Sequence, residues 1–353
     1  MKNCNIIIPG NKKLTPAEMF TKMAAWSEAN NVDFDVYGNG KTLAAFEKKI
    51  ADLLGFDAAM FCITGTMTQP MALEMACEGK ITNNVVMHPS SHILLHEHQN
   101  YQVQNRFNVL PVGAPYTTWD LSDLQHIQDP ISAVLYELPM REIGGQLPEW
   151  DQLEKIKRHC KDNDIHLHMD GARLWESAAY YKQPYSEIAQ GFDSVYVSLY
   201  KGINGIGGAL LLGDKPFINK AKVWSRRQGG DVYHRTPYIV AAMMQFDDRI
   251  NLMPALFNRT QWIVEELSKL PNIQVNPTKP MANMIHIYLP VSEKRALEIR
   301  DELADKHQVW FGNPRQAALP NQSYIEWYIG DHALNTPDIE LKEALQLLSD
   351  SVI

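Results

Sequence analysis

Two residues have the types and surroundings needed for nucleophilic and acid–base catalysis. Lys201 follows the apolar run DSVYVSLY and opens KGINGIGG, a glycine-rich turn. An amine in such a solvent-poor turn loses its proton more easily than an exposed lysine, and the neutral amine is a nucleophile. Asp170 ends another apolar run, in HLHMDGARLW, where a carboxylate can accept a proton or pair with a cationic ring nitrogen. Their simpler interpretations are a solvated lysine and a helix-capping aspartate.

A third feature could bind phosphate. Gly65 and Thr66 stand where the apolar run AAMFCITG meets a helix-favouring segment. Backbone N–H groups, the positive end of a helix dipole and a hydroxyl would converge there, although an ordinary turn has the same residues. Histidines crowd between residues 88 and 98, but they do not form HExxH, so we expect no metal site.

The elements that must position these residues alternate between strand and helix. Apolar spacing predicts helices over Thr42–Leu54 and Glu149–Cys160. The alternation predicts an α/β fold with a mostly parallel sheet sandwiched by helices, and ligands then gather at the carboxyl ends of the strands. The predicted strands are Ala58–Gly65, Asn84–Met87, Ser132–Glu137, Ile165–Met169, Ser194–Leu199 and Gly208–Leu212.

The pattern changes after a predicted helix over Thr236–Asp248. Strands over Met284–Leu289 and Tyr324–Ile329 flank a helix over Ser292–Lys306. We therefore expect a large domain over residues 1–250 and a smaller α+β domain over residues 251–353.

Composition narrows the class of protein. The 353 residues are 45% hydrophobic and 21% charged, which excludes a disordered chain. A formal net charge of −8 gives no general attraction to nucleic acid or to an anionic membrane. The four cysteines show no CxxC pair, and MKNCNIIIPG is too short in apolar residues for a secretion signal, so we expect a cytoplasmic protein.

The chain resembles the L-threonine aldolase and β-eliminating lyase family of fold type I pyridoxal 5'-phosphate (PLP) enzymes. The resemblance runs from about Asp35 to Arg249. In order, it rests on DVYGNGKTLAAFEKKIADLLG, FCITGTMTQPMAL, SHILLHE, GGQLPEWDQLEKI, HMDGARLWESA, DSVYVSLYKGINGIGGALLLG and RRQGG.

The resemblance implies a role for each candidate residue. Lys201 would bond covalently to the PLP aldehyde as a Schiff base, and Asp170 would pair with the pyridine nitrogen. Gly65 and Thr66 would bind the phosphate. His92 would lie against the face of the ring and serve proton transfer at the substrate.

Four further positions follow from the same resemblance. Arg173 would lie near the cofactor and the substrate carboxylate, and Ser198 and Arg226 would contact the cofactor. Tyr37 would line the substrate pocket. Residues 1–34 would lie partly at a dimer or active-site surface, since the family implies a homodimer or homotetramer.

Three departures concern the substrate. The family's amino-terminal Ser-Asp-Thr is absent from IIIPGNKK, Glu326 stands where the family has an arginine, and Met140 replaces a histidine. Candidate replacements are Arg141, Glu142, Arg315 and Glu326. We expect an aldolase that cleaves a β-hydroxy-α-amino acid to glycine and an aldehyde. The alternatives are β-elimination or another Cα-bond reaction on a different amino acid or amine, and an inactive PLP-fold binding protein.

Overall fold

The computed structural model describes residues 4–352, which form two units. The larger unit comprises Leu14–Glu142 and Leu147–Asn251. The smaller unit comprises residues 4–13, Ile143–Gln146 and residues 252–352. Residues 4–13 thus group with the carboxyl-terminal segment, whereas the sequence pattern assigned them to the large domain. The long helix α10 (Thr236–Leu267) runs through the boundary expected near residue 250.

A seven-stranded sheet in the order β2-β8-β7-β6-β5-β3-β4 forms the centre of the larger unit. Only the pairs that involve β8 are antiparallel, which confirms the mostly parallel sheet. The strands β5, β7 and β8 are buried along their whole length, as expected for a sheet covered on both faces. The strands are β2 (Ala58–Cys62), β3 (Asn84–Met87), β4 (Asn108–Pro111), β5 (Ala133–Glu137), β6 (His166–Gly171), β7 (Ser194–Ser198) and β8 (Ala209–Gly213).

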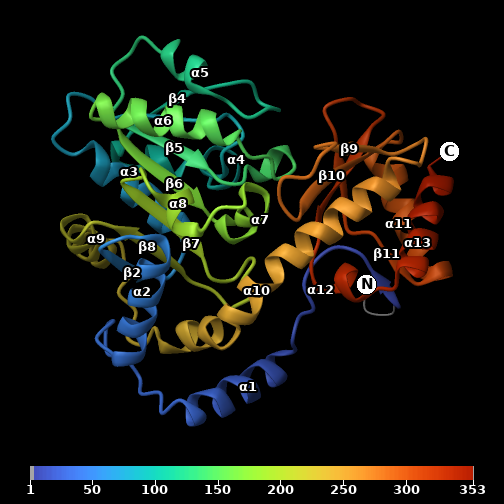
Figure 1. Cartoon of the computed structure of the whole chain (residues 1–353), viewed down its shortest axis with the longest axis horizontal. Helices are drawn as coiled ribbons and strands as arrows, with labels where there is room; N and C mark the ends of the chain where they lie inside the picture. The colour runs from blue at the N-terminus through green and yellow to red at the C-terminus, as the bar shows by residue number, and fades with distance from the viewer. Residues whose placement is uncertain (1–3, 353) are drawn as a thin grey trace. The chain divides into compact units, whose positions relative to one another are not determined.

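Helices cover this sheet, and one of them matters most for the site (Figure 1). The helix α3 (Gly65–Cys77) crosses the sheet and contacts β2, β3, β5, β6 and β7. The predicted helix α2 (Lys41–Leu54) ends at Gly55, which has a positive φ of 75°. The other helices are α1 (Pro16–Ala29), α4 (His92–His96), α5 (Leu121–Gln125), α6 (Trp150–Asp162), α7 (Ala178–Tyr181), α8 (Tyr185–Ala189) and α9 (Lys215–Arg227), with short 3₁₀ turns η1 (Asn100–Asn105), η2 (Arg141–Ile143) and η3 (Leu174–Glu176).

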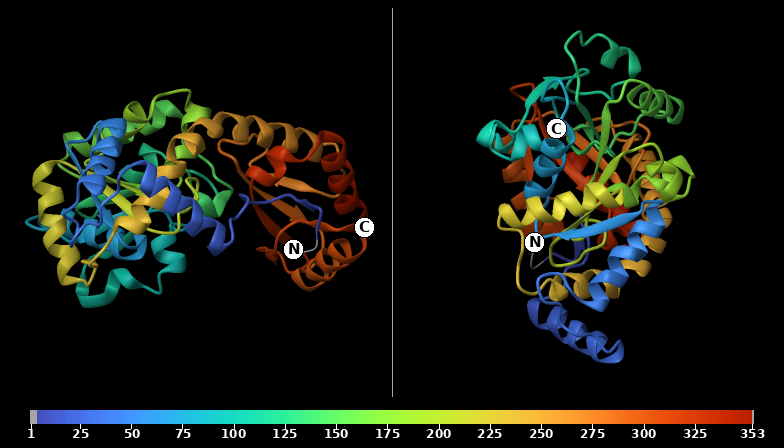
Figure 2. Two further views of the ribbon diagram at one scale, coloured as in Figure 1. Left: turned by 90° about the horizontal axis from the view of Figure 1, so that it is seen from below. Right: turned by 90° about the vertical axis from the view of Figure 1, so that its left-hand side faces the viewer.

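The smaller unit has its own sheet and core (orange and red in Figure 2). Four strands pair antiparallel in the order β12-β13-β10-β9, and β1 pairs with β11. Trp327 is fully buried in this core. The elements are β1 (Ile6–Ile7), β9 (Gln274–Asn276), β10 (Met284–Leu289), β11 (Val309–Trp310), β12 (Pro314–Gln316), β13 (Ser323–Tyr328), α11 (Glu293–His307), α12 (Asp331–Asn335) and α13 (Asp338–Ser351).

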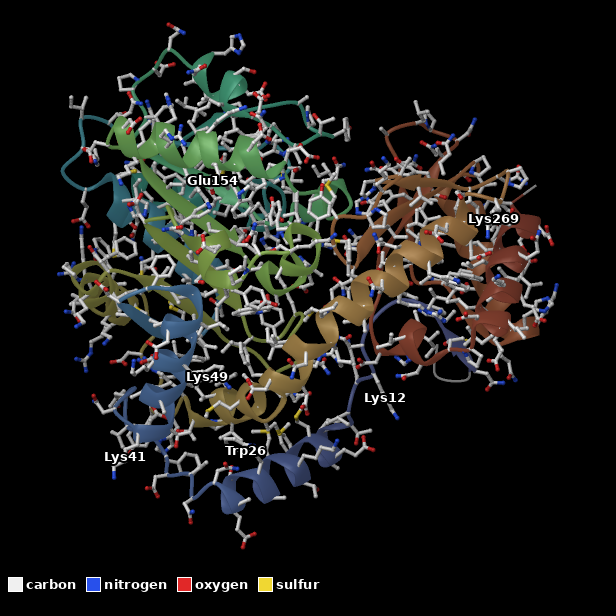
Figure 3. All side chains as sticks on the ribbon, in the orientation of Figure 1. Lys12, Trp26, Lys41, Lys49, Glu154 and Lys269 are labelled. Atoms are coloured by element: carbon white, nitrogen blue, oxygen red, sulfur yellow. The ribbon has the colours of Figure 1, made fainter. Side chains whose placement is uncertain are left out.

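Several ion pairs lie exposed on the surface and contribute little to the free energy of unfolding. Lys49 on α2, labelled in Figure 3, lies 2.6 Å from Asp247 on α10. Such pairs contribute about 0–1 kcal/mol because water screens them. Within residues 4–352, no helix is both long and apolar enough to cross a bilayer.

Candidate active site

Asp170 lies near the carboxyl end of β6 and is only 1% exposed. Its Oδ2 accepts a hydrogen bond of 2.6 Å from Gln69 Nε2, and its Oδ1 accepts one of 3.0 Å from the backbone N–H of Ala172. Two donors therefore fix the orientation of this buried carboxyl near the carboxyl end of β6.

Lys201 lies in the loop between β7 and β8 and interacts electrostatically with Asp170. Burial and then the Arg173 guanidinium lower the pKa of the Lys201 amine to about 8, while the Asp170 and Glu137 carboxyls oppose that shift. The amine and the acid singled out from the sequence are thus brought together at one end of the sheet.

The lowered pKa of Lys201 predicts how fast the cofactor-free protein combines with an aldehyde. Only the neutral amine reacts, so the rate falls about tenfold per pH unit below pH 8 and levels off above it. Stopped-flow absorbance with PLP, from about pH 6 to about pH 10, measures the profile. A rate that keeps rising to about pH 10, as for an exposed lysine, would contradict the prediction.

Glu137 is a site residue that the sequence reasoning missed. It ends β5, directly opposite Asp170 in the strand register, and is 6% exposed. Its Oε1 accepts a hydrogen bond from the backbone N–H of Arg141, while its Oε2 is buried without a partner in the described part of the chain. Burial and then the Asp170 carboxyl raise the pKa of Glu137. Its place at the end of a predicted strand was the available signal.

The first turn of α3 lies against β7, the strand that pairs with the Asp170 strand β6. Thr64 caps the helix, and the leading N–H groups of any helix have no intrahelical acceptor. A Cβ on Gly65 would lie 2.2 Å from the Tyr196 hydroxyl, and Tyr196 is opposite Asp170 on β7. Gly65 and Thr66 therefore begin a helix that lies against the strand next to Asp170.

This close approach predicts that Gly65→Ala is harmful. The added methyl group must displace the Tyr196 ring or the helix, which we expect to cost roughly 1–3 kcal/mol of unfolding free energy. Tyr196→Phe removes the nearest oxygen, so the double variant recovers part of the loss. Thermal unfolding of both variants measures this. Equal loss in the single and double variants would assign the cost to the backbone instead.

His92 is oriented by a buried acid. It is the first residue of α4, and its Nδ1 lies 3.0 Å from Oε1 of Glu97, whose side chain is 2% exposed. With Nδ1 donating its proton to Glu97, the lone pair of His92 is on Nε2. Glu97 also acts electrostatically on Tyr196 and Tyr200, so this pair lies near the Asp170 edge. The sequence did not reveal the His92–Glu97 pairing.

Of the other crowded histidines, His96 pairs with Glu142 through Nε2 at 2.7 Å. His88 contacts Ser90 and a backbone carbonyl. Within residues 4–352, no group of three or more His, Cys, Asp or Glu side chains is arranged to hold a metal ion.

Arg173 and Ser198 differ in what their polar groups do. Arg173 Nε is buried with no hydrogen-bond partner among the described residues, and its charge acts on both Lys201 and Tyr200. Ser198 is fully buried, and its hydroxyl donates to the Ala172 carbonyl at 2.8 Å. Arg173 is therefore available for an anion, whereas the Ser198 hydroxyl is already engaged.

Tyr37 and Arg226 are not brought to this edge by any described contact within 4–352. Tyr37 is 48% exposed and meets Tyr233 edge to face, at 5.2 Å between ring centroids. Arg226 pairs with Asp231 at 3.0 Å and its side chain is 74% exposed. Their roles stay predictions.

The substrate-side candidates fall in both units. Arg141 acts electrostatically on Lys201 and pairs with Glu142 at 3.1 Å. Met140, in the same segment, is fully buried. In the smaller unit, Arg315 is exposed on β12, and Glu326 on β13 lies 3.9 Å from His286.

Comparisons with known proteins identify the family and the fold of the chain. The family model for beta-eliminating lyase matches residues 15–289. The low-specificity L-threonine aldolase of Candida albicans is 30% identical over 59% of this chain and 57% of that protein. Low-specificity L-threonine aldolase 1 of Arabidopsis thaliana is 26% identical over 72% of this chain and 74% of that protein. A solved structure of a candidate L-allo-threonine aldolase from Listeria monocytogenes is 34% identical, has a TM-score of 0.93, and covers 99% of this chain and 97% of that one. This likeness confirms the expected fold type I architecture.

Proposed function

Because the chain belongs to the beta-eliminating lyase family and is a PLP-dependent lyase of the threonine aldolase type, we propose that it cleaves a β-hydroxy-α-amino acid to glycine and an aldehyde. The observation that carries this proposal is the Lys201 amine, with its lowered pKa, beside the buried Asp170 carboxylate. The reaction needs an aldehyde-binding amine and an acid that keeps a pyridine ring protonated.

The residues present fit PLP. Arg173 Nε and Glu137 Oε2 are both buried without partners among the described residues, and both groups act on Lys201. Unpaired polar groups in one place are costly unless a ligand completes them. When bound, PLP supplies an aldehyde for the amine and a protonated ring that stabilises negative charge at Cα. Lys201 would hold the aldehyde end, Asp170 would hold the ring nitrogen, and Gly65 with Thr66 would hold the phosphate.

His92 acts on the substrate side. Its Nε2 accepts the proton of the β-hydroxyl while Glu97 steadies the imidazole through Nδ1. As that proton leaves, the oxygen forms the carbonyl of the departing aldehyde, the Cα–Cβ bond breaks, and its electron pair stays at Cα. Asp170 would pair with the ring nitrogen and favour its protonated form, and the cofactor would then supply a positively charged acceptor for the electrons left at Cα.

Because Glu97 orients the His92 imidazole, we expect Glu97→Gln to lower kcat about tenfold. The substitution replaces a charged hydrogen bond to the imidazole with a neutral one. Steady-state cleavage assays measure the change. The matched control is His96→Gln, which removes the ring that contacts His92 at 5.1 Å between centroids but leaves the His92 Nδ1–Glu97 Oε1 interaction in place. If Glu97→Gln leaves kcat unchanged, or if both variants lose the same activity, Glu97 does not orient the base.

The substrate carboxylate needs a cation. Arg173, whose Nε has no hydrogen-bond partner among the described residues, is the first candidate of the larger unit, and Arg141, which pairs with Glu142 and acts on Lys201, is the second. A planar guanidinium can grip a carboxylate with two hydrogen bonds. This supports an amino acid as substrate.

The activity is tested by comparing two sets of products. The PLP-loaded protein is given threonine, allo-threonine and phenylserine, and glycine and aldehyde are measured; serine and cysteine conjugates are tested for pyruvate and ammonia. Glycine with aldehyde supports the proposal. Pyruvate with ammonia would assign the chain to β-elimination, and no product from any substrate would favour an inactive binding protein.

The proposal extends to assembly and location. A homodimer or homotetramer is supported by exposed aromatic side chains near Asp35, namely Phe34 (66%), Tyr37 (48%) and Tyr233 (54%). A cytoplasmic location is supported by the free thiols of all four cysteines.

A further inference from the structure

A chain of hydrogen bonds runs through the sheet from its amino-terminal edge to Asp170. His166 Nε2 lies 2.7 Å from Ser194 Oγ, and the same oxygen lies 2.7 Å from His168 Nδ1. His168 Nε2 then lies 3.2 Å from Gln69 Oε1, and Gln69 Nε2 donates to Asp170 at 2.6 Å. At its other end, His166 borders a surface pocket.

The donors and acceptors of these side chains can be arranged in two self-consistent ways along the hydrogen-bond chain. If Asp170 is ionised, the Gln69 amide must turn its N–H towards it and its oxygen towards His168. His168 then carries its proton on Nε2, and Ser194 donates to Nδ1. If Asp170 is protonated, every donor reverses and His168 carries its proton on Nδ1. The tautomer of His168 is therefore tied to the charge of Asp170.

Burial selects neutral imidazole for His168. The side chain is fully buried, and burial lowers the pKa of His168 to about 3, so it cannot serve as a cation in the chain. The N–H of Ala172, which donates to the other oxygen of Asp170, favours the ionised direction because a protonated acid has less to offer a second donor. All donors then point towards Asp170, and such aligned bonds strengthen one another.

We propose that Gln69, His168 and Ser194 are positioning residues that hold Asp170 ionised by directing an unbroken series of donors at its carboxylate. The part of this inference that concerns PLP rests on the proposed function, since it assumes that Asp170 meets the ring nitrogen. The direction in which the hydrogen bonds donate does not depend on any cofactor. Because Gln69 belongs to α3, the chain also fixes that helix against β6.

The direction is tested first in the protein without cofactor. In protein labelled with ¹⁵N-histidine, two-bond ¹H–¹⁵N correlations identify which nitrogen of each imidazole carries the proton. We expect neutral His168 with its proton on Nε2, near neutral pH. A proton on Nδ1, or a cationic His168, would overturn the proposal. This measurement needs no variant, so it cannot be lost through misfolding.

The effect on the site is tested with Ser194→Ala. We expect kcat to fall about tenfold with little change in KM. We also expect the pH midpoint of the visible band of the PLP-loaded protein to move, because the variant removes one hydrogen bond of the series that ends on the Asp170 carboxylate. The matched control is Ser132→Ala. Ser132 is also buried at the amino-terminal end of a strand and donates to a backbone carbonyl, but it is not part of the hydrogen-bond chain.

The outcomes separate this inference from the proposed function. If Ser194→Ala shifts the pH midpoint of the visible band and Ser132→Ala does not, the hydrogen-bond chain is supported. Equal shifts in both variants, or no shift in either, contradict the proposal. A protein that does not bind PLP would defeat the proposed function, and the histidine tautomer would still decide the direction of the chain.

Discussion

Lys201→Ala will lose aldol cleavage by a factor on the order of 10⁴ or more, because no other group can replace a covalently bound amine at this position. Lys201 is the amine whose pKa burial and Arg173 lower to about 8 beside Asp170. The variant will also lose the visible absorption of the PLP-bound protein. Glycine release and absorption spectra, recorded on the same preparations, measure both losses.

The matched control for this variant is Lys222→Ala. Lys222 is an exposed lysine on α9, so its removal should leave both the absorption and the cleavage rate within about twofold of the parent protein. A Lys201→Ala protein that retains the absorption band and the activity would show that another lysine carries the cofactor.

Asp170→Asn will lower kcat by about 10²–10³-fold, as expected when a preorganised charge is removed from a site where charge develops. The variant keeps the size of the side chain but removes the negative charge that Gln69 and Ala172 support. The ring nitrogen then lacks the partner that keeps it protonated. Steady-state kinetics and PLP affinity measure the two consequences separately.

The control for the acid-to-amide change is Asp120→Asn. Asp120 caps α5 through Ser122 and Asp123, and asparagine caps helices about as well as aspartate, so stability and kcat should both be retained. If Asp170→Asn kept more than about a tenth of the parent kcat, the carboxylate would not be central to catalysis.

Asp170 and Lys201 could be singled out from the sequence because their signal is local. Each follows an apolar run, and the rule that ligands meet at strand ends applies to both. Strands β3 and β10 match the predicted Asn84–Met87 and Met284–Leu289 for the same reason. Their apolar runs are continuous and short.

Other features depend on contacts between distant segments. Gln69 meets Asp170 only because α3 crosses the sheet over β6, which no local pattern specifies. The edge strand β4 (Asn108–Pro111) was not predicted, since it is partly exposed and shows no alternation. Helix α10 extends to Leu267 through Pro254, although proline usually ends a helix.

The central claim is that Lys201 carries PLP, and one measurement tests it most directly. The PLP-loaded protein is reduced with borohydride, digested, and mapped by mass spectrometry. The result predicted here is a pyridoxyl group on Lys201, in the peptide that contains KGINGIGG, at close to one per chain. A label on a different lysine, or no label on a protein that has been shown to be folded, would contradict the account.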